Sequence, residues 1–168
     1  DGSRDRSPQL LERSRAAHPE VRVVTHPTNR GYGAALRSGL RAARGERVFF
    51  SDADLQFDLA ELATLLGHAA QLDVVAGYRA PRRDGLGRRL LAFGWSCLVR
   101  TLFGVPVRDI DCAFKIFRRE VLEDLPIASL GAFVNTEILV RAQAAGFRIG
   151  EMPVSHRPRR HGRATGAR

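Results

Sequence analysis

The residues with the clearest chemical potential form a short acidic run, Asp52-Ala53-Asp54-Leu55-Gln56, which follows a run of apolar residues. Two carboxylates at positions i and i+2 that leave a strand point the same way, and Gln56 adds a neutral oxygen. Such an oxygen-rich group suits Mg²⁺ or Mn²⁺ that keeps coordination positions open for substrate phosphates. Asp52, Asp54 and Gln56 are therefore candidate metal ligands, with a solvated acidic turn as the alternative.

A glycine-containing turn, Asn29-Arg30-Gly31-Tyr32-Gly33, lies between a β-branched run and a helical pattern. Glycines let the backbone approach a ligand closely, and the N-terminus of the following helix favours anions. No Gly-Lys-Ser or Gly-Lys-Thr follows, which excludes a P-loop. The pattern is compatible with an anion-binding turn, whereas an ordinary tight turn is the other interpretation of so short a motif.

The elements that must position these residues alternate between strand and helix. Their short connections predict an open parallel or mixed sheet with helices on both faces. The strand over 48–50 is apolar throughout and is expected at the centre of the sheet, with Asp52 at its C-terminal edge. Ligands bind outside the carboxyl ends of strands in such sheets. Strands are predicted at 21–26, 48–50, 74–78, 113–118 and 147–154, and helices at 7–17, 34–44, 58–70, 86–104, 120–125 and 136–145.

Length and composition indicate one globular domain. The chain has 168 residues, of which 44% are hydrophobic and 27% are charged, and this excludes a mainly disordered or collagenous chain. Its cysteines, Cys97 and Cys112, exclude a disulfide scaffold or a zinc ribbon and favour a reducing compartment. No apolar run reaches the roughly 18 residues that a membrane span needs, and no signal peptide is visible.

The positive charge is concentrated in two segments. The formal net charge is +9, and every basic residue except Lys115 is arginine. Arginines gather at 79–108 and 156–168, while the rest of the chain is close to neutral. Two basic segments on a near-neutral body favour an anionic partner, with phosphate, lipid headgroups and nucleic acid as the options.

The segment 86–104 combines this charge with an apolar helical face. Leu91, Trp95, Leu98 and Leu102 fall at helical spacing, and arginines flank them. The pattern suits a helix that lies at a lipid headgroup interface. Packing of the same face into the protein core is the alternative, because helices with one apolar face usually pack inward.

Six motifs, taken in their order along the chain, point to a known family. They are Asp1-Gly2-Ser3; Asn29-x-Gly31-x-Gly33-x-Ala35; the acidic run; Asp109-x-x-Cys112-Ala113-Phe114-Lys115; Gly146-x-x-Ile149-x-Glu151-x-Pro153-Val154, with Glu137 before it; and His156-Arg157-Pro158-Arg159. The chain resembles the family 2 glycosyltransferases, particularly the polyprenyl-phosphate branch that includes dolichol-phosphate mannose synthase. The resemblance covers essentially the whole chain.

This resemblance implies a GT-A-like, Rossmann-like α/β fold with an open mixed sheet that lacks the family's first strand. Asp1-Gly2-Ser3 matches the end of the family's DDGS motif, so the catalytic domain is expected to be truncated at its N-terminus. Residues 1–155 would form this domain fragment, and residues 156–168 a basic C-terminal tail. Many relatives carry C-terminal membrane helices, which a longer parent chain could also have.

The activity implied by the resemblance is an inverting transfer of a sugar from a nucleotide-diphosphate donor to a polyprenyl phosphate or similar lipid-linked acceptor. Asp52, Asp54 and Gln56 would hold the Mg²⁺ or Mn²⁺ that bridges the donor diphosphate. The enzyme would be cytoplasmic and peripheral to the inner face of the membrane, with an anionic membrane surface as partner. Donor contacts are implied at Asp1, Gly2, Ser3, Asn29, Gly31, Gly33 and Asp52.

Further roles are expected for single residues. Asp109 matches an acidic position of the family and is the candidate catalytic residue, which would orient the acceptor or the sugar; a structural carboxylate paired with an arginine is equally open. Glu137, on a mostly apolar helix, is expected to be a buried hydrogen-bonding residue. His18, His26 and His68 show no partner pattern and are interpreted as ordinary surface or loop residues. Candidates for binding the acceptor phosphate are Arg79, Arg88, Arg89, Lys115 and Arg159.

Two other classes of function share some of these features. A nucleotidyltransferase also needs acidic metal ligands, but it would release diphosphate from a nucleoside triphosphate. A non-catalytic nucleic-acid-binding module would fit the charge, although no aromatic-interleaved RNA motif or helix-turn-helix pattern is present. Nucleic acid is therefore not the expected partner, and the sequence leaves the oligomeric state open.

Overall fold

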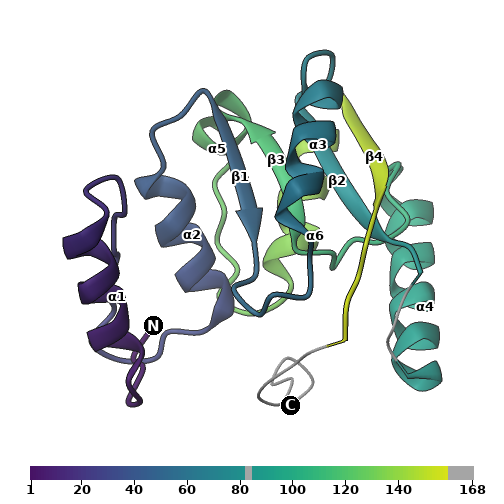
Figure 1. Ribbon diagram of the computed structural model, residues 1–168. Helices are drawn as coiled ribbons and strands as arrows, with labels where there is room; N and C mark the ends of the chain where they lie inside the picture. The colour runs from purple at the N-terminus through teal and green to yellow at the C-terminus, as the bar shows by residue number, and fades with distance from the viewer. Residues whose placement is uncertain (82–84, 159–168) are drawn as a thin grey trace.

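The computed structural model of the chain describes residues 1–81 and 85–158, except for the side chains of Arg88 and Asp124. Every helix predicted from the sequence is present, with its ends shifted by a few residues (Figure 1). The elements are α1 (Ser7–Ala17), α2 (Tyr32–Ala42), β1 (Arg47–Ser51), a 3-10 turn (Leu59–Glu61), α3 (Leu62–Ala69), β2 (Val74–Arg79), α4 (Leu86–Phe103), β3 (Phe114–Arg118), α5 (Arg119–Asp124), α6 (Val134–Ala144) and β4 (Ile149–Val154).

The four strands of the described residues form one open mixed sheet, and their order is β1-β3-β2-β4. The sequence predicted an open parallel or mixed sheet but not this order. β3 is antiparallel to both β1 and β2, whereas β2 and β4 are parallel. Phe49 of β1 and Val75 of β2 both lie opposite Ile116 of β3. It follows that β1, β2 and β4 run in the same direction and reach the same edge of the sheet with their carboxyl ends.

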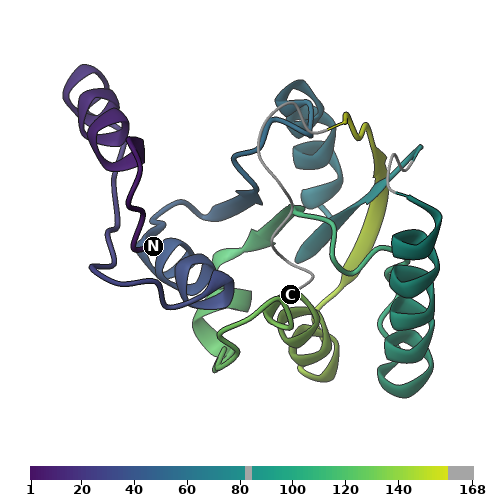
Figure 2. The ribbon, with the colours of Figure 1, turned by 90° about the horizontal axis from the view of Figure 1, so that it is seen from below.

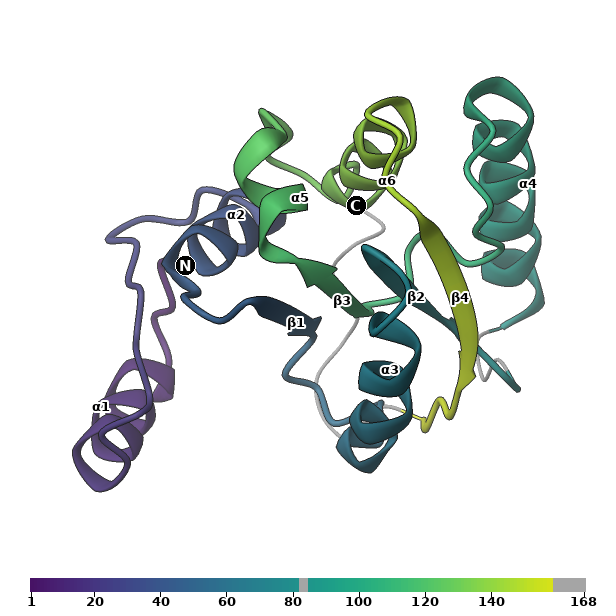
Figure 3. The same ribbon diagram turned by 90° about the horizontal axis from the view of Figure 1, so that it is seen from above.

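Helices cover both faces of the sheet, as Figure 2 and Figure 3 show. Side chains alternate along β2, so Val75 joins a core with Leu65 of α3 while Val74 faces the opposite side. The opposite core is larger and includes Val99 of α4 and Ile138 of α6. α3 therefore covers one face, and α2, α4, α5 and α6 cover the other.

The predicted central place of 48–50 is wrong, because β1 lies at an edge of the sheet beside β3. Val48 is buried, whereas Phe49 and Phe50 are half-buried. Phe49 packs against the core under α3, and Phe50 packs against the opposite core. The run is apolar because both faces of the strand are covered, and this does not require a neighbouring strand on each side.

Residues 21–26, predicted as a strand, do not pair with any strand in the part of the chain that the structure describes. The Val21 N–H donates to the His18 carbonyl at one end, and the His26 carbonyl accepts from the Gly2 N–H at the other. β-branched residues favour an extended backbone, but a strand also needs a partner whose N–H and C=O groups complete the ladder. The local pattern predicted the extended conformation, but it carries no information on whether a partner strand lies beside it.

The apolar residues predicted to share a face of α4 divide between two environments. The Trp95 indole packs inward, where its Nε1 donates to Thr136 Oγ1 at 3.1 Å. Leu91, Leu98 and Leu102 point outward and are 77%, 49% and 64% exposed. These three leucines are therefore not core residues, which decides against the core-packing alternative for them.

Gly77 in β2 occupies a position with no room for a side chain. A Cβ atom there would lie 2.9 Å from the Phe114 carbonyl oxygen and 2.9 Å from Cγ2 of Val154. We expect Gly77→Ala to lower the free energy of unfolding by about 1–3 kcal/mol, because overpacking forces the neighbouring strands apart. Urea unfolding followed by circular dichroism measures the change.

Gly94→Ala in the middle of α4 is the matched control for this prediction. Nothing lies within 4 Å of a Cβ atom at Gly94. Alanine is favoured over glycine in a helix interior, so the free energy of unfolding should rise by up to about 1 kcal/mol. Equal unfolding midpoints for the two variants would contradict the close packing at Gly77.

Candidate functional site

Four segments that are distant in sequence meet at one edge of the sheet. β1 ends there with Ser51, β2 with Arg79 and β4 with Val154, and the antiparallel β3 begins there with Phe114. The polar residues that flank these strand ends are therefore brought together. The prediction that Asp52 follows the carboxyl end of a strand is confirmed.

The acidic run leaves β1 as a turn. Asp54 Oδ1 accepts a hydrogen bond from the Gln56 N–H at 3.2 Å, and Leu55 has a φ of 60°, in the left-handed region. Because the backbone turns here, Asp52 and Asp54 do not continue the strand alternation that the sequence argument assumed. Asp52 is exposed and Asp54 is half-buried, so both carboxylates are accessible from solvent.

The segment after β4 holds this turn from the other side. The Gln56 Nε2 donates to the Arg157 carbonyl at 3.0 Å, and the Arg157 N–H donates to the Gln56 carbonyl at 2.8 Å. The Arg157 guanidinium pairs with Asp58 at 2.5 Å, and the Ser155 N–H donates to Glu61 at 2.9 Å. Because the amide nitrogen of Gln56 faces Arg157, its amide oxygen lies on the opposite side of the group.

The donor set of this turn fits a hard divalent cation. Within residues 1–81 and 85–158, no three or more His, Cys, Asp or Glu side chains are arranged as a metal site. Two carboxylates and an amide oxygen are nevertheless the ligand type that Mg²⁺ and Mn²⁺ prefer, and a cation held by few protein ligands keeps positions for phosphate oxygens. Asp52, Asp54 and Gln56 could hold such a cation.

Tyr32, which the sequence analysis did not single out as a site residue, adjoins the acidic turn. Its hydroxyl lies 3.5 Å from Asp52 Oδ1 and donates a long hydrogen bond to it. Partial burial raises the pKa of Tyr32, and the nearby carboxylates of Asp52 and Asp111 raise it further. The phenol therefore stays protonated at neutral pH. Its place inside the glycine motif was the signal that could have found it.

The glycine turn packs against another loop of the protein. The Gly33 N–H donates to the Leu130 carbonyl at 2.7 Å, and a Cβ atom at Gly33 would lie 2.5 Å from the Ser129 carbonyl oxygen. A Cβ atom at Gly31 would lie 2.8 Å from the Leu130 carbonyl oxygen. These glycines thus have a packing role in addition to the ligand-binding role that remains a prediction.

The residues predicted to contact the donor, apart from Asp52 in the acidic turn, gather at the glycine turn. The Asp1 carboxylate accepts the N–H groups of Arg30 at 2.9 Å and Gly31 at 3.0 Å. The Asn29 side-chain oxygen also accepts from the Gly31 N–H, at 2.9 Å. The cluster at the N-terminus of α2 comprises Asp1, Gly2, Asn29, Gly31 and Gly33, with the exposed Ser3 next to Gly2.

Glu137 of α6 fixes the loop 128–130, against which Gly31 and Gly33 pack. Its carboxylate accepts the N–H groups of Ala128 at 3.1 Å and Ser129 at 2.8 Å, and it pairs with Arg141 at 3.0 Å. Burial by itself would raise the pKa of Glu137, but the hydrogen bonds from Ser129, Ala128 and Arg141 outweigh it and lower the pKa to about 2. The predicted role as a buried hydrogen-bonding residue is confirmed.

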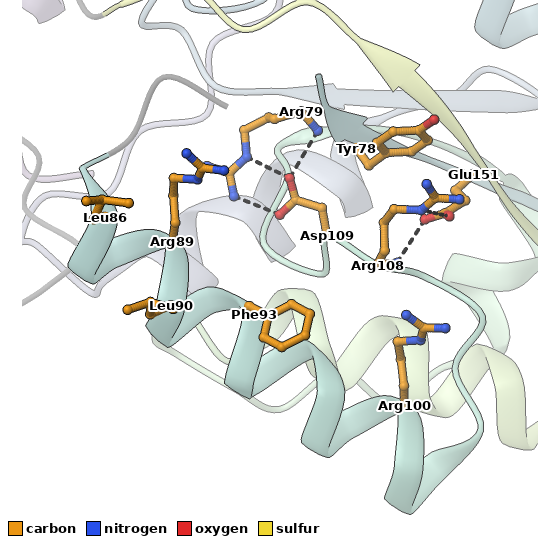
Figure 4. A pocket seen from close by; sticks show the side chains of 10 residues that line it. All are labelled: Tyr78, Arg79, Leu86, Arg89, Leu90, Phe93, Arg100, Arg108, Asp109 and Glu151. Atoms are coloured by element: carbon orange, nitrogen blue, oxygen red, sulfur yellow. Dashed lines mark hydrogen bonds and ion pairs between the residues drawn. The ribbon is translucent and has the colours of Figure 1, made fainter. Parts of the chain in front are cut away.

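A cavity of about 620 Å³ opens between α4 and the same edge of the sheet (Figure 4). Apolar side chains and two arginines of α4 form one wall, while two further arginines, their acidic partners and a tyrosine form the other. Four arginines against two carboxylates leave the cavity with a net positive charge. The lining residues are Tyr78, Arg79, Leu86, Arg89, Leu90, Phe93, Arg100, Arg108, Asp109 and Glu151.

A buried ion pair forms part of the cavity wall. Arg79 Nε donates to Asp109 Oδ2 and Arg79 Nη2 donates to Asp109 Oδ1, both at 2.7 Å. The Arg79 N–H also donates to Asp109 Oδ2, at 3.1 Å. The two side chains are only 9% and 5% exposed. The arginine-paired carboxylate considered for Asp109 is therefore present, and it fixes the direction of the Arg79 guanidinium.

The remaining cationic groups of the cavity differ in how far they are neutralised. Arg108 pairs with Glu151, and its guanidinium carbon lies 4.2 Å from the centre of the Tyr78 ring. Arg89 and Arg100 are exposed on α4 and carry no acidic partner among the described residues. These two α4 arginines are the cationic groups best placed to meet an incoming anion.

The prediction that Lys115 binds the acceptor phosphate is wrong. Its side chain is 1% exposed, and its ammonium donates to the Ile110 carbonyl at 2.9 Å and to the Cys112 carbonyl. The ammonium closes the loop before β3 and is shielded from any ligand in the cavity. Among the other predicted phosphate ligands, the side chain of Arg88 and the whole of Arg159 lie outside the described residues.

The interpretation of His26 as an ordinary surface or loop residue is also wrong. It is 8% exposed, and its ring bonds to Asp1 and Ser38. Both partners are far away in sequence, so no local pattern reveals them. Phe93 and Arg100 were missed as well, although with Arg89 they fall at helical spacing, and a periodicity search that included arginines would have found them.

These features define an α/β protein whose site, suited to a divalent cation and to phosphate groups, lies outside the carboxyl ends of its strands. Residues 1–126 match the family model described as Glycosyl transferase family 2, and the chain belongs to this family. The resemblance inferred from the motifs is thereby confirmed.

Curated relatives include transferases named for polyprenyl-phosphate acceptors. The chain is 35% identical over 165 residues to undecaprenyl-phosphate 4-deoxy-4-formamido-L-arabinose transferase of Pseudomonas aeruginosa. This alignment covers 96% of this chain and 48% of the relative. It is 33% identical over 171 residues to glycosyltransferase AglD of Haloferax volcanii, and this alignment covers 95% of this chain and 27% of the relative. The chain thus spans between about a quarter and a half of the length of these relatives.

Solved structures of glucosyl-3-phosphoglycerate synthase from Mycobacterium tuberculosis have the same fold. The complex with phosphoglyceric acid superposes with a TM-score of 0.71 at 24% identity, over 96% of this chain and 59% of that chain. The complex of that enzyme with Mn²⁺, UDP-glucose and phosphoglyceric acid gives a TM-score of 0.68. The GT-A-like α/β fold class is confirmed.

The burial of the Arg79–Asp109 pair predicts a large effect of removing one partner. We expect Asp109→Asn to lower the free energy of unfolding by about 3–5 kcal/mol, because it removes the carboxylate charge that faces the buried Arg79 guanidinium. Glu123→Gln is the control, since Glu123 is 60% exposed in its pair with Arg119 and should cost less than about 1 kcal/mol. Similar losses for both variants in urea unfolding would show that the Arg79–Asp109 pair is not desolvated.

Proposed function

We propose that this protein transfers a sugar from a nucleotide-diphosphate donor to a polyprenyl phosphate at a membrane surface, with Mg²⁺ or Mn²⁺ as cofactor. The observation that carries the proposal is the arginine-lined, partly apolar cavity at the sheet edge that also bears the acidic turn. Membership of glycosyl transferase family 2 and the names of the curated relatives support the same acceptor class.

The acidic turn would serve the donor. Asp52, Asp54 and Gln56 would hold the divalent cation, which would supply Lewis-acid stabilisation of the leaving diphosphate. Tyr32 and Arg157 hold this turn by hydrogen bonds and so orient its oxygens before a ligand arrives. The glycine cluster would also contact the donor, and its Asp1 carboxylate holds the N–H groups of Arg30 and Gly31 at the start of α2.

The cavity would serve the acceptor. A phosphate monoester is already ionised near neutral pH, so its oxygen can attack the anomeric carbon without a strong general base. The exposed Arg89 and Arg100 would bind the phosphate, while Leu90 and Phe93 offer an apolar surface to the first isoprenoid units. The new bond forms as the bond to the donor diphosphate breaks, which inverts the configuration at the anomeric carbon. Positioning would supply much of the rate.

The outer surface of α4 supports a peripheral position on an anionic membrane, at the cytoplasmic face. Leu91 and Leu98 are exposed beside the arginines of the same helix. An amphipathic helix of this kind buries its apolar side chains at the headgroup boundary, and each nearby arginine adds about 1 kcal/mol. Among the described residues, no helix combines the length and the apolar character that a bilayer crossing requires.

The two alternative functions leave part of the site unexplained. A nucleotidyltransferase would use the acidic turn but not the apolar wall of the cavity. A nucleic-acid-binding module would use the arginines, yet it gives no role to the exposed leucines of α4 or to the acidic turn. The sugar transferase gives a role to the acidic turn, the arginines, the apolar wall of the cavity and the exposed leucines of α4.

The acidic turn makes a test of metal binding possible. We expect Asp54→Ala to weaken Mn²⁺ binding by about tenfold or more in the presence of a nucleoside diphosphate, because one of few charged ligands is lost. Isothermal titration calorimetry with UDP and with GDP measures this affinity. Asp5→Ala, in the exposed segment before α1, is the matched control and should bind as the unaltered protein does. Equal Mn²⁺ affinity for both variants would refute the assignment.

The two surfaces of α4 predict different defects. Arg89→Ala should raise the KM for a short polyprenyl phosphate by about fivefold or more, because a charge-assisted contact with the phosphate is lost. The double variant Leu91→Asp/Leu98→Asp should leave that KM unchanged, because neither leucine lines the cavity. It should abolish co-sedimentation with anionic vesicles at physiological salt, because both exposed apolar side chains are replaced by carboxylates. Transfer assays and vesicle sedimentation measure the two effects.

Arg13→Ala on the exposed α1 is the control for both assays and should alter neither. Duplex and single-stranded oligonucleotides serve as competing anions in the sedimentation assay. Binding to oligonucleotides without preference for anionic vesicles would contradict the membrane partner. An unchanged KM in Arg89→Ala would contradict the placement of the acceptor in the cavity.

A further inference from the structure

His26 forms a bridge that the proposed reaction does not use directly. Its Nδ1 lies 2.7 Å from Asp1 Oδ1, and its Nε2 lies 2.9 Å from Ser38 Oγ. The ring is 8% exposed, and the Asp1 side chain is 16% exposed. A carboxylate can only accept, so Nδ1 carries the proton that bonds to Asp1, and Ser38 on α2 orients the ring from its other side.

The Asp1 carboxylate transmits this arrangement to the glycine turn. It also accepts the N–H groups of Arg30 and Gly31, so three donors converge on its two oxygens. A second tie joins the same segments, because the Gly2 N–H donates to the His26 carbonyl at 3.0 Å. The direction of two consecutive N–H groups at the start of α2 therefore depends on how His26 holds Asp1.

The turn that is fixed in this way leads directly to the acidic turn. Gly31 is followed by Tyr32, the first residue of α2, whose hydroxyl reaches Asp52. A shift of the turn would move Tyr32 relative to Asp52. Surface histidines without buried partners have no such connection; His68 on α3, for example, is exposed.

We infer that His26 is a positioning residue of the donor site: it holds Asp1, and through Asp1 it holds the turn 29–31 that would bind the nucleotide-sugar. The inference rests on the proposed function for the identity of the ligand. It assigns His26 no contact with the donor. Its loss should therefore weaken donor binding and raise the donor KM, while kcat changes little.

Three substitutions separate the two hydrogen bonds of the ring. His26→Leu removes both, Ser38→Ala removes the support from α2, and His26→Asn keeps an N–H donor near the position of Nδ1. We expect His26→Leu to weaken binding of UDP or GDP, measured with Mn²⁺ by calorimetry, by about tenfold. His26→Asn should restore most of this affinity, Ser38→Ala should be intermediate, and His68→Leu should have no effect.

Amide hydrogen exchange provides a readout that needs no ligand. In His26→Leu, exchange at Arg30 and Gly31 should accelerate, while exchange in β3 should stay as slow as in the unaltered protein. Unchanged exchange at Arg30 and Gly31 would overturn the positioning role, and faster exchange with unchanged nucleotide affinity would overturn its connection to the donor.

Accelerated exchange throughout β3 would show a general loss of stability and would also overturn the inference. If the unaltered protein binds neither nucleotide, the proposed function fails instead. The exchange at Arg30 and Gly31 then still decides whether His26 holds the turn. The two failures are therefore distinguishable.

Discussion

The common direction of β1, β2 and β4 is the constraint on which the whole site depends. Because β3 runs against them, three strand ends and one strand start share an edge of the sheet. Polar turns can follow the strands there without placing unpaired backbone groups in the core. The acidic turn after β1, Arg79 at the end of β2 and the segment after β4 thus become neighbours, although the chain between them contains four helices.

The site also depends on partial neutralisation of the arginine charges inside the cavity. Four arginines around one cavity would repel one another, and the carboxylates of Asp109 and Glu151 offset two of them. The Arg79–Asp109 pair is almost fully desolvated, so its geometry is held tightly and its charge contributes little to the outside. Arg89 and Arg100 remain exposed on α4, which leaves the net positive charge on the wall beside Leu90 and Phe93.

The sequence predicted those features that depend on local chemistry. Helices, the mixed sheet and the acidic turn follow from periodicity and from turn residues, and six motifs in order identified the family. The strand order could not be predicted in this way. A strand at the edge of the sheet is as apolar as a central strand when both of its faces are covered, as those of 48–50 are. The burial of Lys115 had a signal, since Phe117 lies two residues further on the same face of the strand and belongs to the larger core, but the charge of Lys115 was taken to indicate phosphate binding. The partners of His26 depend on tertiary contacts that no local pattern contains.

The acidic turn is held from two sides, by Tyr32 and by the segment that follows β4. Leu55 adopts a left-handed conformation that costs about 1–2 kcal/mol for a residue with a Cβ atom. The two hydrogen bonds between Gln56 and Arg157 and the contact of Tyr32 with Asp52 offset that cost while no cation is bound. The oxygens are therefore ordered before a ligand arrives, so little entropy is lost on binding. Under the proposed function, the turn would supply three ligand side chains and the donor diphosphate would supply further ligands, so that binding of cation and donor would be coupled.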